Sequence, residues 1–208
     1  EVFLDDALRL KLKDSRKKLK FTDEERSELK KLFEGERLDW DVLFNLFQEK
    51  RVNPVNMMMS PVFLDIIMQL CSERFAYLSF TDFFYNVRSM VLPELYLITQ
   101  EVPKADIYHA TATGYSGILA SLGKWKYNKP FILTEHGIYT REREEELLRA
   151  DWVLPYFRGQ WINLFHLFSD CAYTHADVVT ALFSRANEAQ RELGCAEGKL
   201  CVTPNGVH

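Results

Sequence analysis

Several features that would assign a function at once are missing from this chain of 208 residues. Its four cysteines are scattered and none forms a CxxC pair, so neither a zinc ribbon nor a disulfide scaffold is indicated. No run of about 18 apolar residues occurs, and no signal peptide pattern, so no membrane span is expected. The net charge is −4 without a long basic block, which disfavours nucleic acid as the main partner.

Nucleotide and hydrolase motifs are also missing. The chain has no Gly-Lys-Ser/Thr phosphate loop and no G-x-G-x-x-G. Gly114-Tyr115-Ser116-Gly117 resembles a nucleophile elbow, but Ile118 replaces the final glycine, which argues against a serine hydrolase. No His, Cys or Asp set has metal-ligand spacing, so we expect no metal. Dispersed cysteines are typical of buried thiols in a reducing cytosol, and we expect a cytoplasmic protein.

Both ends of the chain look like cuts through a longer protein. Glu1 opens an amphipathic stretch that contains Val2-Phe3-Leu4 and Ala7-Leu8. The last residue, His208, follows the turn signal Asn205-Gly206. We therefore expect a fragment.

Residues 1–100 are predicted to be a helical segment that packs on the following domain. Thr22 and Glu25 form a capping box, and Gly35 is a natural stop. Ser60-Pro61 predicts another helix start, with that helix running to about Arg74. Two more helices are predicted over 40–50 and 81–99, the second kinked or interrupted at Pro93.

Residues 101–208 alternate between strands and helices, which predicts a Rossmann-like α/β domain: a parallel sheet with helices on both faces. Short β-type runs are expected at 107–110, 131–134, 177–183 and 200–203. Helices are expected over 115–126, 141–150, 159–176 and 184–193. Ser184 is the predicted N-cap of the last helix and Gly194 its stop.

The stretch Leu133 to Arg143 carries the most chemistry. It places His136, Arg141 and Arg143 where a strand gives way to a helix, and ligands of parallel sheets bind beyond the carboxyl ends of strands. Imidazole exchanges hydrogen bonds and arginine binds phosphate, so this stretch suggests a phosphate-bearing ligand such as a sugar nucleotide. Arg141 has a competing interpretation, in which it pairs with Glu145 on a solvated helix.

A second candidate region follows the first strand. His109 ends that predicted strand, and the small residues of Thr111 to Gly117 would let backbone N–H groups approach an anion. Close helix–strand packing explains the same glycines equally well, so this loop alone assigns no function.

Three runs of sequence together resemble the amino-terminal domain of family-4 retaining glycosyltransferases, and among them the PelF-type enzymes of Pel exopolysaccharide synthesis. They are His109-Ala-Thr-Ala-Thr-Gly-Tyr-Ser-Gly117, Leu133 to Arg143, and Val202-Thr-Pro-Asn-Gly-Val207. The runs Phe80 to Phe84 and Arg88 to Pro93 resemble that subfamily's helical insertion. This sequence departs from the pattern of such enzymes in two ways. It lacks their first strand with its glycine-rich loop, and it lacks their donor domain. In addition, such enzymes usually have Asp at the position of His208.

The resemblance implies the amino-terminal half of a GT-B fold, which binds the sugar acceptor while an absent carboxy-terminal domain binds a nucleotide sugar, here expected to be UDP-linked. Catalysis would need no metal. His136 would be the catalytic residue, near the donor sugar, and Asn205-Gly206 would be the interdomain hinge. The fragment alone would be inactive, and membrane-bound polysaccharide synthase components would be possible partners. The substrate-binding residues would be Gly114, Tyr115, Glu135, Gly137, Arg141, Arg143 and His109.

Two other functions fit the same sequence. A two-domain UDP-sugar epimerase would share the architecture but would need a carboxylate acid–base pair at the cleft. A non-catalytic domain that docks a polysaccharide synthase complex would show exposed apolar patches on residues 1–100.

Overall fold

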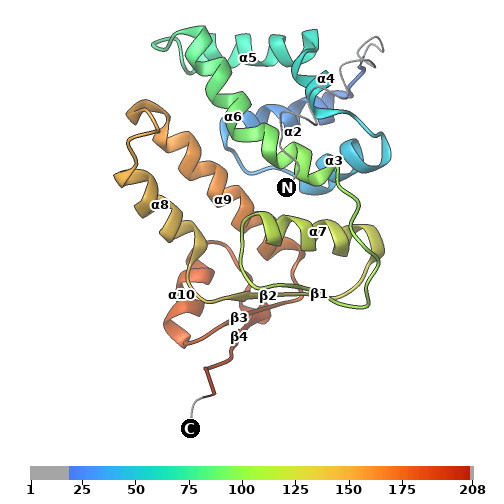
Figure 1. Cartoon of the computed structure of the whole chain (residues 1–208), viewed down its shortest axis with the longest axis vertical. Coiled ribbons are helices and arrows are strands. Elements are labelled where there is room, and N and C mark those ends of the chain that lie inside the picture. Colours follow the sequence, from blue (N-terminus) through green and yellow to red (C-terminus); the bar gives the residue numbers. More distant parts are fainter. Residues whose placement is uncertain (1–18, 207–208) are drawn as a thin grey trace. The chain divides into compact units, whose positions relative to one another are not determined.

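The computed structural model describes residues 19–206 and divides the chain into two compact units, Glu1–Gln100 (unit 1) and Glu101–His208 (unit 2) (Figure 1). The amphipathic stretch predicted at the amino terminus and the final residue His208 lie outside the described residues.

Unit 1 is built from helices, and its helix starts confirm two of the predictions. Thr22 and Glu25 form the predicted capping box, and Ser60 caps a helix that begins with Pro61. The helix predicted over 40–50 is present, but it turns from α into π at Asn45, and a short helix at Pro54 was not predicted. The elements are α2 (Asp23–Glu34), α3 (Trp40–Phe44), the π-helical η2 (Asn45–Glu49), α4 (Pro54–Met58), α5 (Pro61–Glu73) and α6 (Phe80–Ile98).

Helix α6 passes through Pro93, so the predicted interruption there is wrong. Proline lacks the N–H that would bond to the Ser89 carbonyl, which usually weakens a helix. The residues on both sides of Pro93 are buried, among them Val91 and Leu95, each 1% exposed or less. Their packing compensates for the missing hydrogen bond and keeps the helix continuous.

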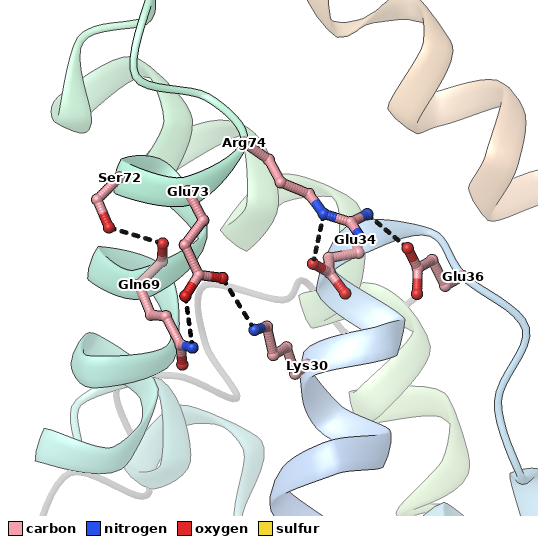
Figure 2. Close-up of polar contacts among 7 residues, drawn as sticks. All are labelled: Lys30, Glu34, Glu36, Gln69, Ser72, Glu73 and Arg74. Atoms are coloured by element: carbon pink, nitrogen blue, oxygen red, sulfur yellow. Dashed lines mark hydrogen bonds and ion pairs between the residues drawn. The ribbon is translucent and has the colours of Figure 1, made fainter.

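The core of unit 1 is aromatic, and ion pairs join its surface. Leu32 and Phe33 of α2 are fully buried, and the Phe33 ring meets Phe63 of α5 edge-on at 5.3 Å. Hydrogen bonds and ion pairs around Arg74 also join α2 to the end of α5 (Figure 2). The Arg74 guanidinium reaches Glu34 at 3.3 Å and Glu36 at 2.5 Å. The pair with Glu36 is exposed and adds little stability, whereas Glu34 is buried and its carboxylate is partnered by Arg74.

Unit 2 confirms the α/β prediction. Its four strands are parallel and adjacent in the order β1-β2-β3-β4, flanked by helices. The strands are β1 (Tyr108–Ala110), β2 (Phe131–Glu135), β3 (Val178–Ala181) and β4 (Leu200–Val202). The helices are α7 (Tyr115–Tyr127), α8 (Tyr139–Arg149), η3 (Pro155–Phe157), α9 (Arg158–His175), α10 (Ser184–Glu192) and η4 (Glu197–Lys199).

The described helices of unit 2 gather on one face of this sheet. The strand register places Leu133, Glu135 and Val179 on the same face, where all three are buried. The Glu135 side chain meets α9 and α10 there, and α7 lies on the same side as α9 (Figure 1). The sheet was expected to have helices on both faces; on the opposite face His109 and Cys201 are exposed in the described part of the chain.

Candidate functional site

The candidate site is the carboxyl edge of the sheet, from which the turns after all four parallel strands emerge. Ligands of open parallel sheets bind at this edge because loops and helix N-termini converge there. The turn after β1 is Thr111–Gly114, and the turn after β2 is His136–Ile138. Most of the residues that the sequence singled out lie in these two turns or directly after them.

Gly114 is fixed by both conformation and contact. Its φ is +78°, a left-handed value that residues with a side chain rarely adopt. A Cβ at this position would lie 2.8 Å from the Tyr139 ring, so only glycine lets the turn after β1 approach the start of α8. Gly114 is buried, and this packing accounts for it without a ligand. The neighbouring Tyr115 is 48% exposed and its ring leans on Phe168 at 5.6 Å.

Glu135, the last residue of β2, lies beneath the edge rather than on it. It is 2% exposed, and its carboxylate accepts hydrogen bonds from Thr113 at 2.5 Å, Tyr173 at 2.8 Å and Gln190 at 2.9 Å. We call these four residues the Glu135 cluster. The predicted direct contact of Glu135 with substrate does not fit this geometry, because the carboxylate faces the interior and its oxygens already have donors.

Electrostatics favour the arrangement of the Glu135 cluster. Burial and, next, the Glu135 carboxylate raise the pKa of Tyr173 far above its usual value, so its hydroxyl stays protonated and donates. Burial also raises the pKa of the nearby Cys195 thiol to about 11, although Lys199 opposes the shift. A protonated phenol is the form of Tyr173 that can donate to Glu135, as the hydrogen bond at 2.8 Å requires.

His136 is the exposed residue of the edge. It follows the buried Glu135 directly, in the turn after β2, and its side chain is exposed. Gly137 comes next, and the Glu142 carboxylate lies close to the position that a Cβ there would take. The histidine is therefore presented in a turn that the exposed Glu142 side chain adjoins.

His109 does not lie at the edge. It was predicted at the end of its strand, but it is the middle residue of β1, on the sheet face opposite to Glu135. Its Nε2 is 2.9 Å from the Thr134 hydroxyl, which in turn contacts Thr180 at 2.8 Å. The structure therefore does not bring His109 together with the residues of the edge.

The two arginines after β2 are engaged by acidic residues at the surface. Arg141 bonds to Glu192 of α10 at 2.7 Å instead of pairing with Glu145, its expected partner. Arg143 contacts Glu146 at 2.5 Å, lies 5.8 Å from the Tyr139 ring centroid, and lines an open hollow of about 500 Å³ along α8. Exposed pairs of this kind contribute about 0–1 kcal/mol, so a bound phosphate can displace them.

Three helices begin at this edge without a side-chain cap. The residues before α7, α8 and α10 are Gly114, Ile138 and Phe183, and none accepts a side-chain hydrogen bond from the helix. Ser184 was predicted as the cap of α10, but it is the first helical residue, and Phe183 precedes it in an extended conformation. Helix N-termini are favourable positions for anions, and at these three starts no N-cap side chain competes for that position.

The remaining predicted residues lie after β4. Asn205 and Gly206 are exposed, and the last hydrogen bond before them joins the Thr203 N–H to the Ala181 carbonyl at 2.8 Å. Within residues 19–206, no three His, Cys, Asp or Glu side chains are grouped so that they could hold a metal ion. Over the same residues, no helix combines the length and the apolar character that crossing a bilayer requires.

Sequence reasoning missed the partners that organise the edge. Tyr173 and Gln190 lie 38 and 55 residues from Glu135 in the chain, and both appeared to be ordinary helix residues. One signal was present: alternation along β2 places Glu135 on the same face as the buried Phe131 and Leu133. A carboxylate in that position requires donors, and these can be sought among the helices that cover the face.

Comparison with known proteins identifies a family but no activity. Searches among characterised proteins and among solved structures gave no match. One family profile matches residues 1–198, nearly the whole chain, and spans both units. The chain therefore belongs to the family described as a domain of unknown function, DUF3492.

Proposed function

We propose that this chain is the acceptor-side domain of a retaining glycosyltransferase that uses a nucleotide sugar, UDP-linked in our expectation, for exopolysaccharide synthesis in the cytoplasm. The observation that carries the proposal is the placement of His136, which is exposed at the carboxyl end of β2. The resemblance of residues 133–143 to family-4 enzymes also supports it, as does a Rossmann-like sheet whose edge is open to a ligand.

The chemistry available at the edge suits a phosphorylated sugar. The His136 imidazole can donate a hydrogen bond to a sugar hydroxyl or accept one from it. The starts of α7 and α8 have no side-chain cap, and helix N-termini attract anionic oxygens through the helix dipole. Arg141 and Arg143 can supply planar, bidentate contacts to phosphate once it displaces their surface partners. Glu135 supports this edge from below and does not touch the ligand.

An epimerase is less well supported by the geometry. That reaction would need two carboxylates, or an equivalent acid–base pair, facing the ligand. The carboxylate at the end of β2, Glu135, is buried under three donors and is not free to exchange protons with a substrate. Glu142, next to the turn at Gly137, is an exposed carboxylate, but in the described part of the chain no second carboxylate is assigned beside it as the other half of such a pair.

A non-catalytic docking role is the second candidate function, and one observation favours it. Unit 1 exposes large apolar side chains on α5 and α6 and in the turns before them. Exposed apolar groups that gather on one surface are typical of protein contacts, and components of a membrane-bound polysaccharide synthase are the partners we would test. The exposed residues are Met59, Leu64, Met68, Tyr77, Phe80 and Tyr85, with exposed fractions of 41–70%.

A transfer assay tests the proposal. The complete protein that carries this chain would be incubated with UDP-glucose, UDP-galactose and their N-acetyl derivatives, and UDP release would be measured with and without an oligosaccharide acceptor. We expect acceptor-dependent UDP release with one of these donors and retention at the anomeric carbon. The 208-residue chain alone should bind no UDP-sugar with sub-micromolar affinity. A complete protein that releases no UDP would contradict the proposal, as would tight donor binding by the chain alone.

A further inference from the structure

The Glu135 cluster ties together elements that are far apart in sequence. Thr113 belongs to the turn after β1, Tyr173 to α9 and Gln190 to α10, and all three donate to one carboxylate. Every member is buried, with exposed fractions between 0 and 3%. The cluster therefore fixes the turn after β1 and the end of β2 against two helices at one point beneath the edge.

His136 stands next to this fixed point. Glu135 is buried and His136, the next residue, is exposed, so the orientation of the peptide unit between them determines where the imidazole is presented. Three hydrogen bonds on the Glu135 side chain restrict the rotation of the backbone that carries His136. The Thr113 hydroxyl extends the same restraint to the turn that ends at Gly114.

Stability alone does not account for a carboxylate in this position. Removing a charge from water costs several kcal/mol, and replacing buried charged groups by apolar residues of similar size is often neutral or stabilising. An apolar side chain at position 135 would also bury well on this face of the sheet. What it would not provide is a directional link to Thr113, Tyr173 and Gln190.

We propose that Glu135 is a positioning residue, which holds the His136 turn and the turn after β1 in the geometry that binds ligand at the carboxyl edge. The role in binding rests on the proposed function, whereas the restraint on the two turns does not.

The test compares variants of the full chain. Tyr173→Phe and Thr113→Val each remove one buried hydroxyl and so break the cluster. Thr113→Ser keeps the hydroxyl and should leave the cluster intact. The matched control is Ser169→Ala, four residues before Tyr173 in α9. Ser169 is 1% exposed, and its hydroxyl bonds to Thr140 at 2.6 Å, outside the cluster.

Hydrogen exchange is the first measurement, because it needs no activity. We expect amide exchange over 112–117 and 136–138 to rise about tenfold in Tyr173→Phe and Thr113→Val, the factor that matches the loss of one hydrogen bond to a charged group. Thr140, the partner of the control residue Ser169, lies outside these segments. Thr113→Ser and Ser169→Ala should exchange like wild type in these segments. The proposal is overturned if Ser169→Ala shows the same rise, or if neither cluster variant shows one.

Activity of the complete protein is the second measurement. With the donor found in the transfer assay, Thr113→Val should lower kcat about tenfold, Thr113→Ser should restore it, and Ser169→Ala should leave it unchanged. Equal losses in Thr113→Val and Ser169→Ala would overturn the positioning role. If wild type shows no transfer at all, the proposed function fails, and the exchange data still decide whether Glu135 holds the two turns.

Discussion

The two units begin their α-helices in different ways. In unit 1, each of the five described α-helices starts with a side chain that accepts a hydrogen bond from the first turn: Thr22, Asp39, Asn53, Ser60 and Ser79. In unit 2, no side chain caps α7, α8, α9 or α10. Unit 1 therefore specifies its helix starts locally, whereas unit 2 depends on the sheet and on long-range contacts to place them.

The presence or absence of a side-chain cap also matters for ligand binding. A capping side chain occupies the N–H groups that an anionic ligand would use. Helices that only build a scaffold gain stability from a cap, and those of unit 1 have one. At the helices α7, α8 and α10, which begin at the carboxyl edge, no N-cap side chain accepts a hydrogen bond from the first turn. The edge is organised instead from below, by the Glu135 cluster.

The largest effect should come from a second carboxylate inside the Glu135 cluster. The Gln190 amide nitrogen lies 2.9 Å from Glu135, so Gln190→Glu brings two buried carboxyl groups together and costs about 3 kcal/mol or more at pH 7. The pair would share a proton, which raises its folded-state pKa. Stability should be retained at acid pH and lost as the pH rises through that raised pKa.

Urea unfolding of Gln190→Glu at pH 5 and pH 8 checks this prediction. The free energy of unfolding of wild type should change much less between these two pH values. A Gln190→Glu variant that is equally stable at both pH values would show that the cluster is less enclosed than the structure indicates.

Removing caps should separate the two units directly. Thr22→Ala and Ser60→Ala should each lower the free energy of unfolding by about 1 kcal/mol, because each exposes an unsatisfied N–H. Ser184→Ala should change it by less than about 0.5 kcal/mol, since Ser184 is exposed and caps nothing. Chemical denaturation of the three variants provides the measurement. If Ser184→Ala lowers the free energy of unfolding as much as Ser60→Ala does, the two units do not differ in how their helices are capped.

Asp177, which accepts a hydrogen bond from the first residue of β2, should make the stability of the protein depend on pH. Partial burial raises the pKa of Asp177, but Lys124 and the Phe131 N–H outweigh it, so its folded-state pKa lies below its usual value of 3.8. The resulting stabilisation is present above the usual pKa and is lost as the pH falls through the lowered one. Acid unfolding of Asp177→Asn should therefore be less steep below pH 4 than that of wild type, with Asp151→Asn as the control.

The smallest effect concerns the thiols. Cys201 is exposed on the uncovered face of the sheet, while Cys195 is buried and its thiol pKa is raised to about 11. Iodoacetamide at pH 8 should therefore modify Cys201 well before Cys195. Peptide mass spectrometry over time gives the two rates. Similar rates would mean that the interior near Glu135 opens frequently.

The same comparison explains what could be predicted from the sequence. Capping residues are short-range signals, so the helices at Thr22 and Ser60 were predicted with correct starts. Alternation of strand and helix is also local in character, and it predicted that the four strands form one parallel sheet, as the structure confirms. The predicted cap at Ser184 failed because a serine at a helix start looks the same whether its hydroxyl accepts a bond or faces solvent.

The interior of the candidate site depends on contacts that no local pattern reveals. The bonds of Glu135 span 22 to 55 residues, and the partner of Arg141 proved to be Glu192, 51 residues away. Gly114 was predicted as a substrate-binding residue, which stays a prediction, whereas its contact with the Tyr139 ring could be seen only in the fold. Continuity of α6 through Pro93 likewise depends on the burial of its neighbours.

The kcat of His136→Ala in the complete protein, measured beside its melting temperature, tests the central claim most directly. Our account predicts that kcat falls by about 10²- to 10³-fold while the melting temperature barely changes, because an exposed residue at the edge contributes chemistry rather than packing. His166→Ala, another exposed histidine of unit 2, is the control and should retain wild-type kcat. Wild-type turnover in a stably folded His136→Ala protein would contradict the account.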